Sequence, residues 1–238
     1  MRAIRFKAFG DPSVLELIEA PDPIADEKTA VVRVRAASVG VNYLAAWLGL
    51  EAADLKPRET ALLIGAAGGV GGAAAQIARR LGARVIGADR RPPLAEAPIR
   101  AIAETLIVGA EDLPAEVRAA TGGKGADVVF DLVGGVMFKN ALACLARRGR
   151  LIEIAATGTR EVSFDLADFY HNESRLFGID TLKRDLTASA EALGRLTPGF
   201  VAGDYRAAPI AMTFDLIDAP EAYGKVAAGV AGRVVLRP

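Results

Sequence analysis

A glycine-rich turn and one carboxylate give the clearest chemical signal in this chain. The turn, at residues 65–72, separates an apolar run, Ala61–Ala66, from a helical segment that begins near Val70. Glycines allow a pyrophosphate to approach the backbone, and the helix directs its positive amino-terminal end at that phosphate. Asp89 stands 18 residues after Gly71, where a carboxylate would accept hydrogen bonds from an adenosine ribose. This combination predicts a site for NAD or NADP.

The residues predicted to contact the dinucleotide come from four separate loops. They are Ala67, Gly68, Gly69, Val70, Gly71, Asp89, Arg90, Arg91, Asp131, Val133, Gly134, Ala155 and Ala156. Ligands of an open α/β sheet lie beyond the carboxyl ends of its strands, so the loops at Asp131 and Ala155 should flank the nicotinamide ribose. A turn or a helix cap is an equally good interpretation of Asp131.

The choice between the two dinucleotides depends on the residues at the end of the second strand. Asp89 favours NAD, because a carboxylate accepts from the ribose 2′ and 3′ hydroxyls and repels a 2′-phosphate. Arg90 and Arg91 favour NADP if their guanidinium groups clamp that phosphate, and they are equally well explained as a solvated loop. The sequence favours NAD and leaves NADP open.

The glycine spacing fits two patterns. An A-x-G-x-x-G pattern starts at Ala66, while the G-x-x-x-G-x-G pattern of short-chain reductases starts at Gly65. Short-chain reductases use a tyrosine as proton donor, with a lysine four residues later that lowers the tyrosine pKa. The residues four places after the tyrosines of this chain are Trp47, Ser174, Pro209 and Ala227. None is lysine, so the short-chain reductase interpretation is rejected.

Composition narrows the class of protein. The chain has 238 residues, of which 52% are hydrophobic and 24% charged, and this is typical of a globular protein. Lys plus Arg and Asp plus Glu both number 29, so neither nucleic acid nor an anionic membrane is indicated as a partner. Residues 1–20 alternate charged and apolar side chains and lack the apolar core of a signal peptide.

Cys144 is the only cysteine and His171 the only histidine. An intrachain disulfide is therefore impossible, which fits a reducing cytoplasm. A catalytic zinc site draws most of its ligands from these two residue types, so no metal site is predicted. Cys144 is expected to be a buried core thiol and His171 a polar turn residue rather than a proton shuttle.

The order of the predicted elements indicates the fold. From Glu59 the chain alternates strands and helices, which predicts an α/β fold with a Rossmann-type, doubly wound parallel sheet. The strands are expected at Ala61–Ala66, Arg84–Ala88, Thr105–Val108, Asp127–Asp131, Arg150–Ala155 and Leu176–Asp180. Helices are expected from Val70 and at Tyr43–Leu55, Ile99–Glu104, Leu113–Ala120, Val136–Ala146 and Thr187–Leu196. A smaller β-rich domain should form from strands at Arg2–Phe9, Val14–Glu19, Ala30–Ala37 and Gly232–Leu236. The predicted domains are 1–50 with 206–238, and 51–205.

Several segments resemble one family. Thr121–Gly135, TGGKGADVVFDLVGG, resembles a signature of the zinc-independent medium-chain dehydrogenases/reductases, in the branch of quinone oxidoreductase and zeta-crystallin. Residues 1–21, 30–43, 65–87 and 222–238 are similar to other segments of that branch, in the correct order. The resemblance implies hydride transfer from NAD(P)H to a small quinone or α,β-unsaturated carbonyl, without zinc and with water able to supply the proton. We expect a cytoplasmic enzyme.

The resemblance also exposes a departure. Asn42 and Tyr43 match the asparagine–aromatic pair that the family places near the nicotinamide, and they are the candidate catalytic residues, but Leu44 stands where Asp is common. Soon after Tyr43 the nucleotide fold begins, so we expect the middle of the family's β-barrel to be missing and a reduced, GroES-like remnant to be left.

Two hypotheses follow. The first is a compact oxidoreductase with an open substrate pocket, and the second is a nucleotide-binding protein with little or no turnover. Apolar surface exposed by the missing part of the barrel would have to be covered by a second subunit. The edge strand Leu176–Asp180 could pair across a two-fold axis to form such a homodimer.

Overall fold

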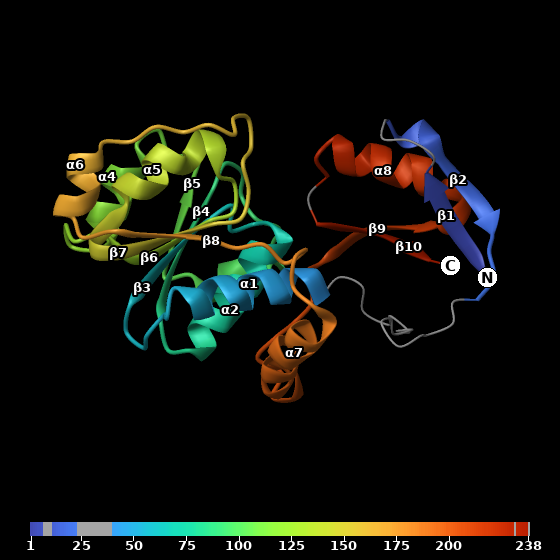
Figure 1. The fold of residues 1–238 in the computed structure, drawn as a ribbon, viewed down its shortest axis with the longest axis horizontal. Helices are drawn as coiled ribbons and strands as arrows, with labels where there is room; N and C mark the ends of the chain where they lie inside the picture. Colours follow the sequence, from blue (N-terminus) through green and yellow to red (C-terminus); the bar gives the residue numbers. More distant parts are fainter. Residues whose placement is uncertain (7–10, 23–39, 231, 238) are drawn as a thin grey trace. The chain divides into compact units, whose positions relative to one another are not determined.

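A computed structural model of the chain describes residues 1–6, 11–22, 40–230 and 232–237 (Figure 1). The chain divides into two compact units, Met1–Ala37 with Pro209–Pro238, and Ser38–Ala208. Helix α1, Gly40–Ala52, belongs to the second unit, although the predicted boundary placed most of it in the terminal domain. The reason is packing, since α1 contacts the helices α2, Gly69–Arg80, and α7, Leu186–Val201.

The terminal unit contains two small sheets. Strands β1, Arg2–Phe6, and β2, Leu15–Glu19, pair antiparallel, with a 3-10 turn at Pro12–Val14 between them. Strands β9, Ile210–Asp215, and β10, Arg233–Arg237, pair in parallel. The chain between them forms a 3-10 turn at Leu216–Asp218 and helix α8, Ala219–Ala227. Strand β10 was predicted, whereas β9 and α8 were not. The strand predicted at Ala30–Ala37 lies outside the described residues.

The larger unit is built on a parallel sheet of six strands in the order β5-β4-β3-β6-β7-β8. These strands are β3 Thr60–Ile64, β4 Arg84–Asp89, β5 Thr105–Val108, β6 Ala126–Asp131, β7 Leu145–Glu153 and β8 Arg175–Gly178. Every residue of β3 is buried, as expected for a central strand covered on both faces. The chain adds strands first on one side of β3 and then on the other, which is the Rossmann order and confirms the predicted fold class.

Helices cover both faces of this sheet. Figure 1 shows α1 and α2 on one side, and α4, Leu113–Ala120, with α5, Phe138–Ala143, on the other. Side chains alternate accordingly: Leu63 and Phe130 join the core beneath α1 and α2, while Leu62 and Val129 join the core beneath α4 and α5.

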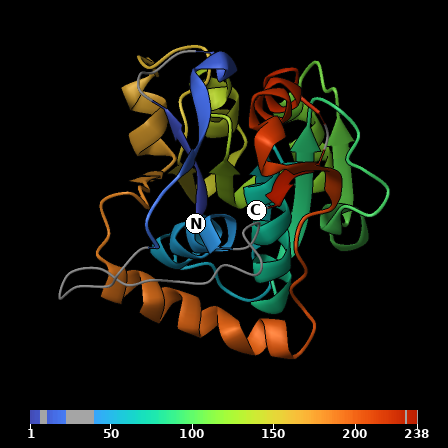
Figure 2. The same cartoon turned by 90° about the vertical axis from the view of Figure 1, so that its right-hand side faces the viewer.

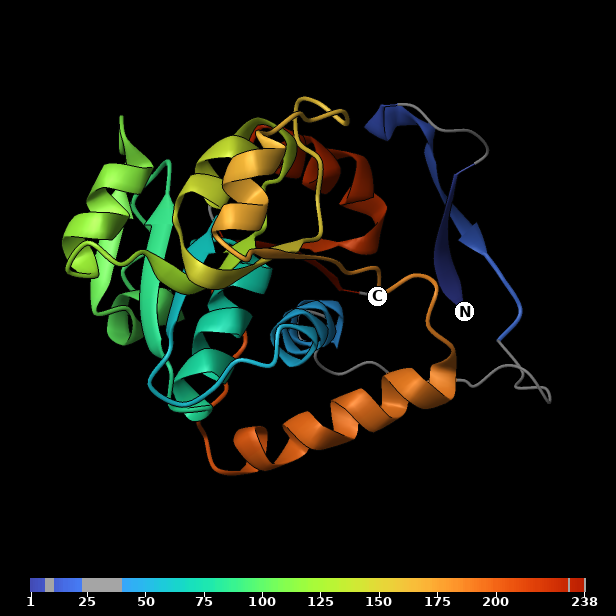
Figure 3. The same cartoon turned by 60° about the vertical axis from the view of Figure 1, so that its left-hand side comes forward.

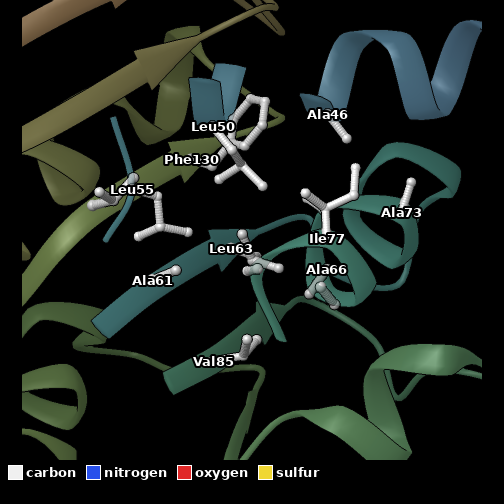
Figure 4. Close-up of a cluster of buried hydrophobic side chains, with 14 of the residues drawn as sticks. Ala46, Leu50, Leu55, Ala61, Leu63, Ala66, Ala73, Ile77, Val85 and Phe130 are labelled. Atoms are coloured by element: carbon white, nitrogen blue, oxygen red, sulfur yellow. The ribbon is translucent and has the colours of Figure 1, made fainter. Parts of the chain in front are cut away.

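Short side chains allow the elements of the first core to approach closely. Figure 4 shows side chains from α1 (Ala46, Leu50), α2 (Ala73, Ile77) and β3 (Ala61, Leu63) gathered in this cluster. A Cβ on Gly49 of α1 would lie 2.5 Å from the Phe130 ring. Helix α7 runs past α1 on its outer side (Figures 2 and 3), where Ala192 packs against Leu44 and Leu48.

The larger unit has two further helices. Two predictions, for His171 and for the end of the helix at Val136–Ala146, are corrected here. The further helices are α3, Pro98–Ile102, and α6, Leu166–His171, so His171 ends a helix capped by Asp165 rather than standing in a turn. The helix predicted through Ala146 ends at Ala143, because β7 begins at Leu145 and the Cys144 carbonyl accepts from Ala126 N at 2.9 Å. No helix in the described ranges is both long and apolar enough to cross a bilayer.

Candidate functional site

The glycine turn folds back onto the neighbouring strand. Gly65 follows β3 with φ of 83°, a conformation that favours glycine. Its amide and that of Ala66 both donate to the Ala88 carbonyl of β4, at 2.9 and 3.1 Å. Gly68 N then donates to Gly65 O at 3.1 Å. These bonds fix the turn at the carboxyl edge of the sheet.

Helix α2 begins with unused backbone donors. Gly68 occupies the N-cap position and provides no side-chain cap. The helical hydrogen bonds start with Gly72 N to Gly68 O at 2.9 Å, so the amides of residues 69–71 have no partner inside the helix. The first turn contains no acidic residue, and the last turn contains Arg79 and Arg80. The amino-terminal end of α2 is therefore free to bind an anion.

Neighbouring atoms lie so close to two glycines of this turn that a side chain would not fit there. A Cβ on Gly71 would lie 2.6 Å from Gly65 O and 2.7 Å from the Cα of Ala66. A Cβ on Gly69 would collide with the side-chain amide of Asn42. Gly71 belongs to both spacing patterns, and its contacts are those of the glycine that brings a helix close to a strand.

The Asp89 carboxylate accepts hydrogen bonds from the glycine turn and from its own loop. Its Oδ2 accepts from Ala67 N at 2.9 Å and its Oδ1 accepts from Arg91 N at 3.2 Å. A carboxylate offers about four lone-pair sites, so acceptor capacity is left for ribose hydroxyls. The side chains of Arg90 and Arg91 are exposed beside it.

The loops after β6 and β7 are tied to each other. Asp131 is fully buried, and its Oδ1 accepts from Val133 N and Gly134 N, both at 2.9 Å. Gly134 forms an antiparallel bridge with Ala156, and Thr157 N donates to Val133 O at 3.0 Å. Asp131 therefore closes a turn, which is one of the two interpretations that its sequence position allowed.

The two halves of the site meet between β3 and β6, where the direction of strand addition reverses. Leu132 N donates to Ile64 O at 3.1 Å, and a Cβ on Gly65 would lie 3.3 Å from Val133 Cγ2. The structure thus brings the glycine turn, the Asp89 region and the loops at Gly134 and Ala156 to one edge of the sheet. Open α/β sheets bind ligands at such a point.

The two candidate catalytic residues differ in position. Asn42 is buried against Gly69 at the start of α2. Tyr43 packs between Phe200 and Tyr205, and its hydroxyl donates to the Arg206 carbonyl at 2.8 Å. Burial raises the pKa of the Tyr43 phenol to about 12, so this group is a poor proton donor.

One acidic residue of the site was missed by the sequence analysis. Glu153 ends β7 in register with Asp131 of β6. Burial, and then the charge of Asp131, raise the pKa of Glu153 to about 8. Burial also raises the pKa of Asp131, although hydrogen bonds from Gly134 and Val133 oppose this. The available signal was a lone acid in the apolar run LIEIA, just before the predicted Ala155 and Ala156.

The described residues do not form a metal centre. No three His, Cys, Asp or Glu side chains among them are grouped so that they could hold a metal ion. Cys144 is buried, and burial raises the pKa of its thiol to about 12, which disfavours the thiolate that zinc requires. Residues of this part of the chain therefore do not fit a zinc site.

Comparison with known proteins gives consistent matches. Residues 69–195 match the family model described as zinc-binding dehydrogenase. A quinone oxidoreductase-like protein 2 homolog of Nematostella vectensis is 35% identical over 122 residues, 50% of this chain and 33% of that protein. Quinone oxidoreductase 1 of Escherichia coli K12 is 33% identical over 159 residues, 63% of this chain and 49% of that protein.

A solved structure extends the likeness. The Escherichia coli quinone oxidoreductase complexed with NADPH superposes with a TM-score of 0.83 and 20% identity, covering 100% of each chain, which is a likeness of fold. The matches with the two curated relatives span about a third and a half of their lengths.

Proposed function

The chain belongs to the zinc-binding dehydrogenase family, and on that premise we propose that it is of the quinone oxidoreductase type and binds NAD or NADP at the carboxyl edge of its sheet. One observation carries the proposal: the uncapped first turn of α2 lies beside Asp89, and the Gly71 contact holds the turn close to the helix. The amides of residues 69–71 bind the pyrophosphate, and Asp89 accepts from the adenosine ribose. The structurally similar Escherichia coli enzyme was solved with NADPH.

The reaction that fits this family position is reduction of a quinone or an α,β-unsaturated carbonyl. When bound, a reduced dinucleotide supplies the hydride, and water supplies the proton. The loops joined by the Gly134–Ala156 bridge position the nicotinamide end and limit its movement. Zinc is not part of the proposed chemistry: no three His, Cys, Asp or Glu side chains among the described residues are grouped to hold a metal ion, and hydrogen-bond donors would stabilise the developing oxyanion.

NAD is the favoured dinucleotide. The Asp89 carboxylate is held in place by Ala67 N and Arg91 N, so a 2′-phosphate would meet a fixed negative charge. The exposed Arg90 and Arg91 keep NADP as the competing candidate, since a guanidinium can move to pair with a phosphate.

A second candidate function is dinucleotide binding with little or no turnover. It is favoured by the Tyr43 hydroxyl, which is buried and committed to the Arg206 carbonyl, so that one of the two candidate catalytic groups is not free.

Fluorescence titration with NADH and NADPH, followed by addition of a quinone or an enone, tests these proposals. Binding followed by oxidation of the cofactor supports the reductase, and the tighter ligand identifies the preferred dinucleotide. Binding without oxidation of either substrate class supports the second candidate. Absence of binding by both dinucleotides rejects both proposals.

We also propose a homodimer formed through β8. This strand is the last of the sheet, and Leu176 on it is 45% exposed. Light scattering should give twice the chain mass, and Leu176→Lys should give the monomer. Val201→Lys, at an 83% exposed position of α7, is the matched control and should leave the dimer intact. A monomeric wild-type protein would refute this arrangement.

A further inference from the structure

Two buried carboxyl oxygens at the site lack hydrogen-bond partners. Within the described residues, Asp131 Oδ2 and Glu153 Oε1 are shielded from solvent and receive no hydrogen bond. Buried polar atoms are nearly always paired, so this arrangement requires an explanation. Ionised carboxylates only accept hydrogen bonds, whereas a protonated carboxyl can also donate one. A single proton between the two groups would therefore satisfy both oxygens.

The strand register places these groups together. Asp131 of β6 and Glu153 of β7 are partners on adjacent parallel strands, so their side chains project from the same face of the sheet. Both also border Gly134. Its amide donates to Asp131 Oδ1 at 2.9 Å, and a Cβ on Gly134 would lie 3.1 Å from Glu153 Oε2. The pair thus lies directly against the loop that forms the Gly134–Ala156 bridge.

Among the described residues, no cation compensates these two carboxyl groups. Asp131 is the titratable group that acts on Glu153, and no ion pair of the described residues includes either carboxyl. Cys144, from the end of α5, lies within electrostatic range of Asp131, but burial raises the pKa of its thiol to about 12 and keeps it neutral. Two negative charges here would repel each other with little screening.

We propose that Asp131 and Glu153 share one proton and that, as positioning residues, they hold the loops at Gly134 and Ala156 in the form that binds the dinucleotide. Loss of the shared proton places a second negative charge beside Gly134 and separates the two loops. The consequence for dinucleotide affinity rests on the proposed function, whereas the shared proton is a property of the protein alone.

The direction of the pH effect follows from burial. Burial and the charge of Asp131 raise the pKa of Glu153 to about 8, so the proton is retained at neutral pH and released in mild alkali. If the dinucleotide binds the protonated form more tightly, its affinity is constant in mild acid and falls as the pH rises through this value.

The pair itself is tested on the protein without ligand. Infrared difference spectra should show a protonated carboxyl that titrates in mild alkali and is absent from Glu153→Gln. Glu161→Gln, at an exposed position in the segment after β7, should retain the signal. If every carboxyl of the wild-type protein is ionised at neutral pH, the shared proton does not exist.

Its role in positioning is tested by NADH affinity across the same pH range. NADH carries no 2′-phosphate, so the ligand does not titrate there. The wild-type protein and Glu161→Gln should lose about tenfold in affinity, the equivalent of a one-unit pKa difference between free and bound protein. Glu153→Gln should show a flat profile, because a glutamine amide can donate to Asp131 at every pH.

The outcomes of the two experiments are separable. Parallel profiles for wild type and Glu153→Gln would overturn the positioning role. Failure of all proteins to bind NADH would reject the proposed function, while the infrared titration would still decide whether the proton is shared.

Discussion

The carboxyl edge around β3 and β4, the first half of the site, leaves the first amides of α2 available, whereas the edge around β6 and β7, the second half, ties its loops to each other and buries Asp131. The first turn of α2 keeps its amides free, and Asp89 is partly exposed. By contrast, Asp131 is fully buried and bonded to the loop that it supports. The difference indicates a division of work: the first half is built to bind a ligand, and the second half to hold loops in place.

The largest effect is expected from Gly134→Ala in the second half. Gly134 has φ of 61° and ψ of −165°, a region that only glycine occupies readily, and an added methyl would collide with the Ala155 carbonyl. The free energy of unfolding should fall by about 3 kcal/mol or more. Urea denaturation measures this change. Gly224→Ala in α8, where no atom lies within 4 Å of the new methyl, should not destabilise the protein, and equal losses in both variants would contradict the explanation.

In the first half, Gly71→Ala should affect both stability and binding. Its Cβ would lie 2.6 Å from Gly65 O, so the turn or the helix must shift, with a loss of about 1–3 kcal/mol in unfolding free energy. Displacement of the α2 amides should also weaken NADH binding by about tenfold or more, measured by fluorescence titration.

The matched control for Gly71→Ala is Gly194→Ala in α7, which has open space around it. Removing a glycine from a helix interior should stabilise the protein by about 0.5–1 kcal/mol and leave NADH affinity unchanged. Unchanged NADH affinity in Gly71→Ala would show that the first half does not bind the dinucleotide as proposed.

The first half was also the more predictable from sequence. Its strands, its turn and the strand end at Asp89 depend on short-range signals, namely apolar runs, glycines and one acid at the expected spacing. The second half depends on pairing between β6 and β7. Nothing local shows that Glu153 faces Asp131, or that Leu145 and Ala146 leave the predicted helix to extend a strand. Long-range register decides both.

The buried acids of the second half predict how stability depends on pH. The pKa of Glu153 is about 8 in the folded protein and near its ordinary 4.5 when unfolded, so the folded state holds more protons between these values. The stability contribution is therefore fully present below pH 4.5 and is lost as the pH rises toward 8. After discounting for partial exposure, the loss should be about 1–3 kcal/mol. Urea denaturation across this range should show a weaker dependence for Glu153→Gln, and an equal dependence would assign the effect to other groups.

The smallest effect on stability is expected from Asp89→Ser, which therefore distinguishes best between a role in dinucleotide binding and a role in supporting the turn. Asp89→Ser removes the charge but keeps a short oxygen that can accept from Ala67 N, so stability should change by less than about 1 kcal/mol. NADH affinity should fall by about 1–2 kcal/mol, because a hydrogen bond between a charged carboxylate and the ribose is lost. NADPH affinity should hold or improve, because the 2′-phosphate then meets Arg90 and Arg91 without an opposing charge. A loss of equal size for both dinucleotides would mean that Asp89 only supports the turn, and the first half would then resemble the second in purpose.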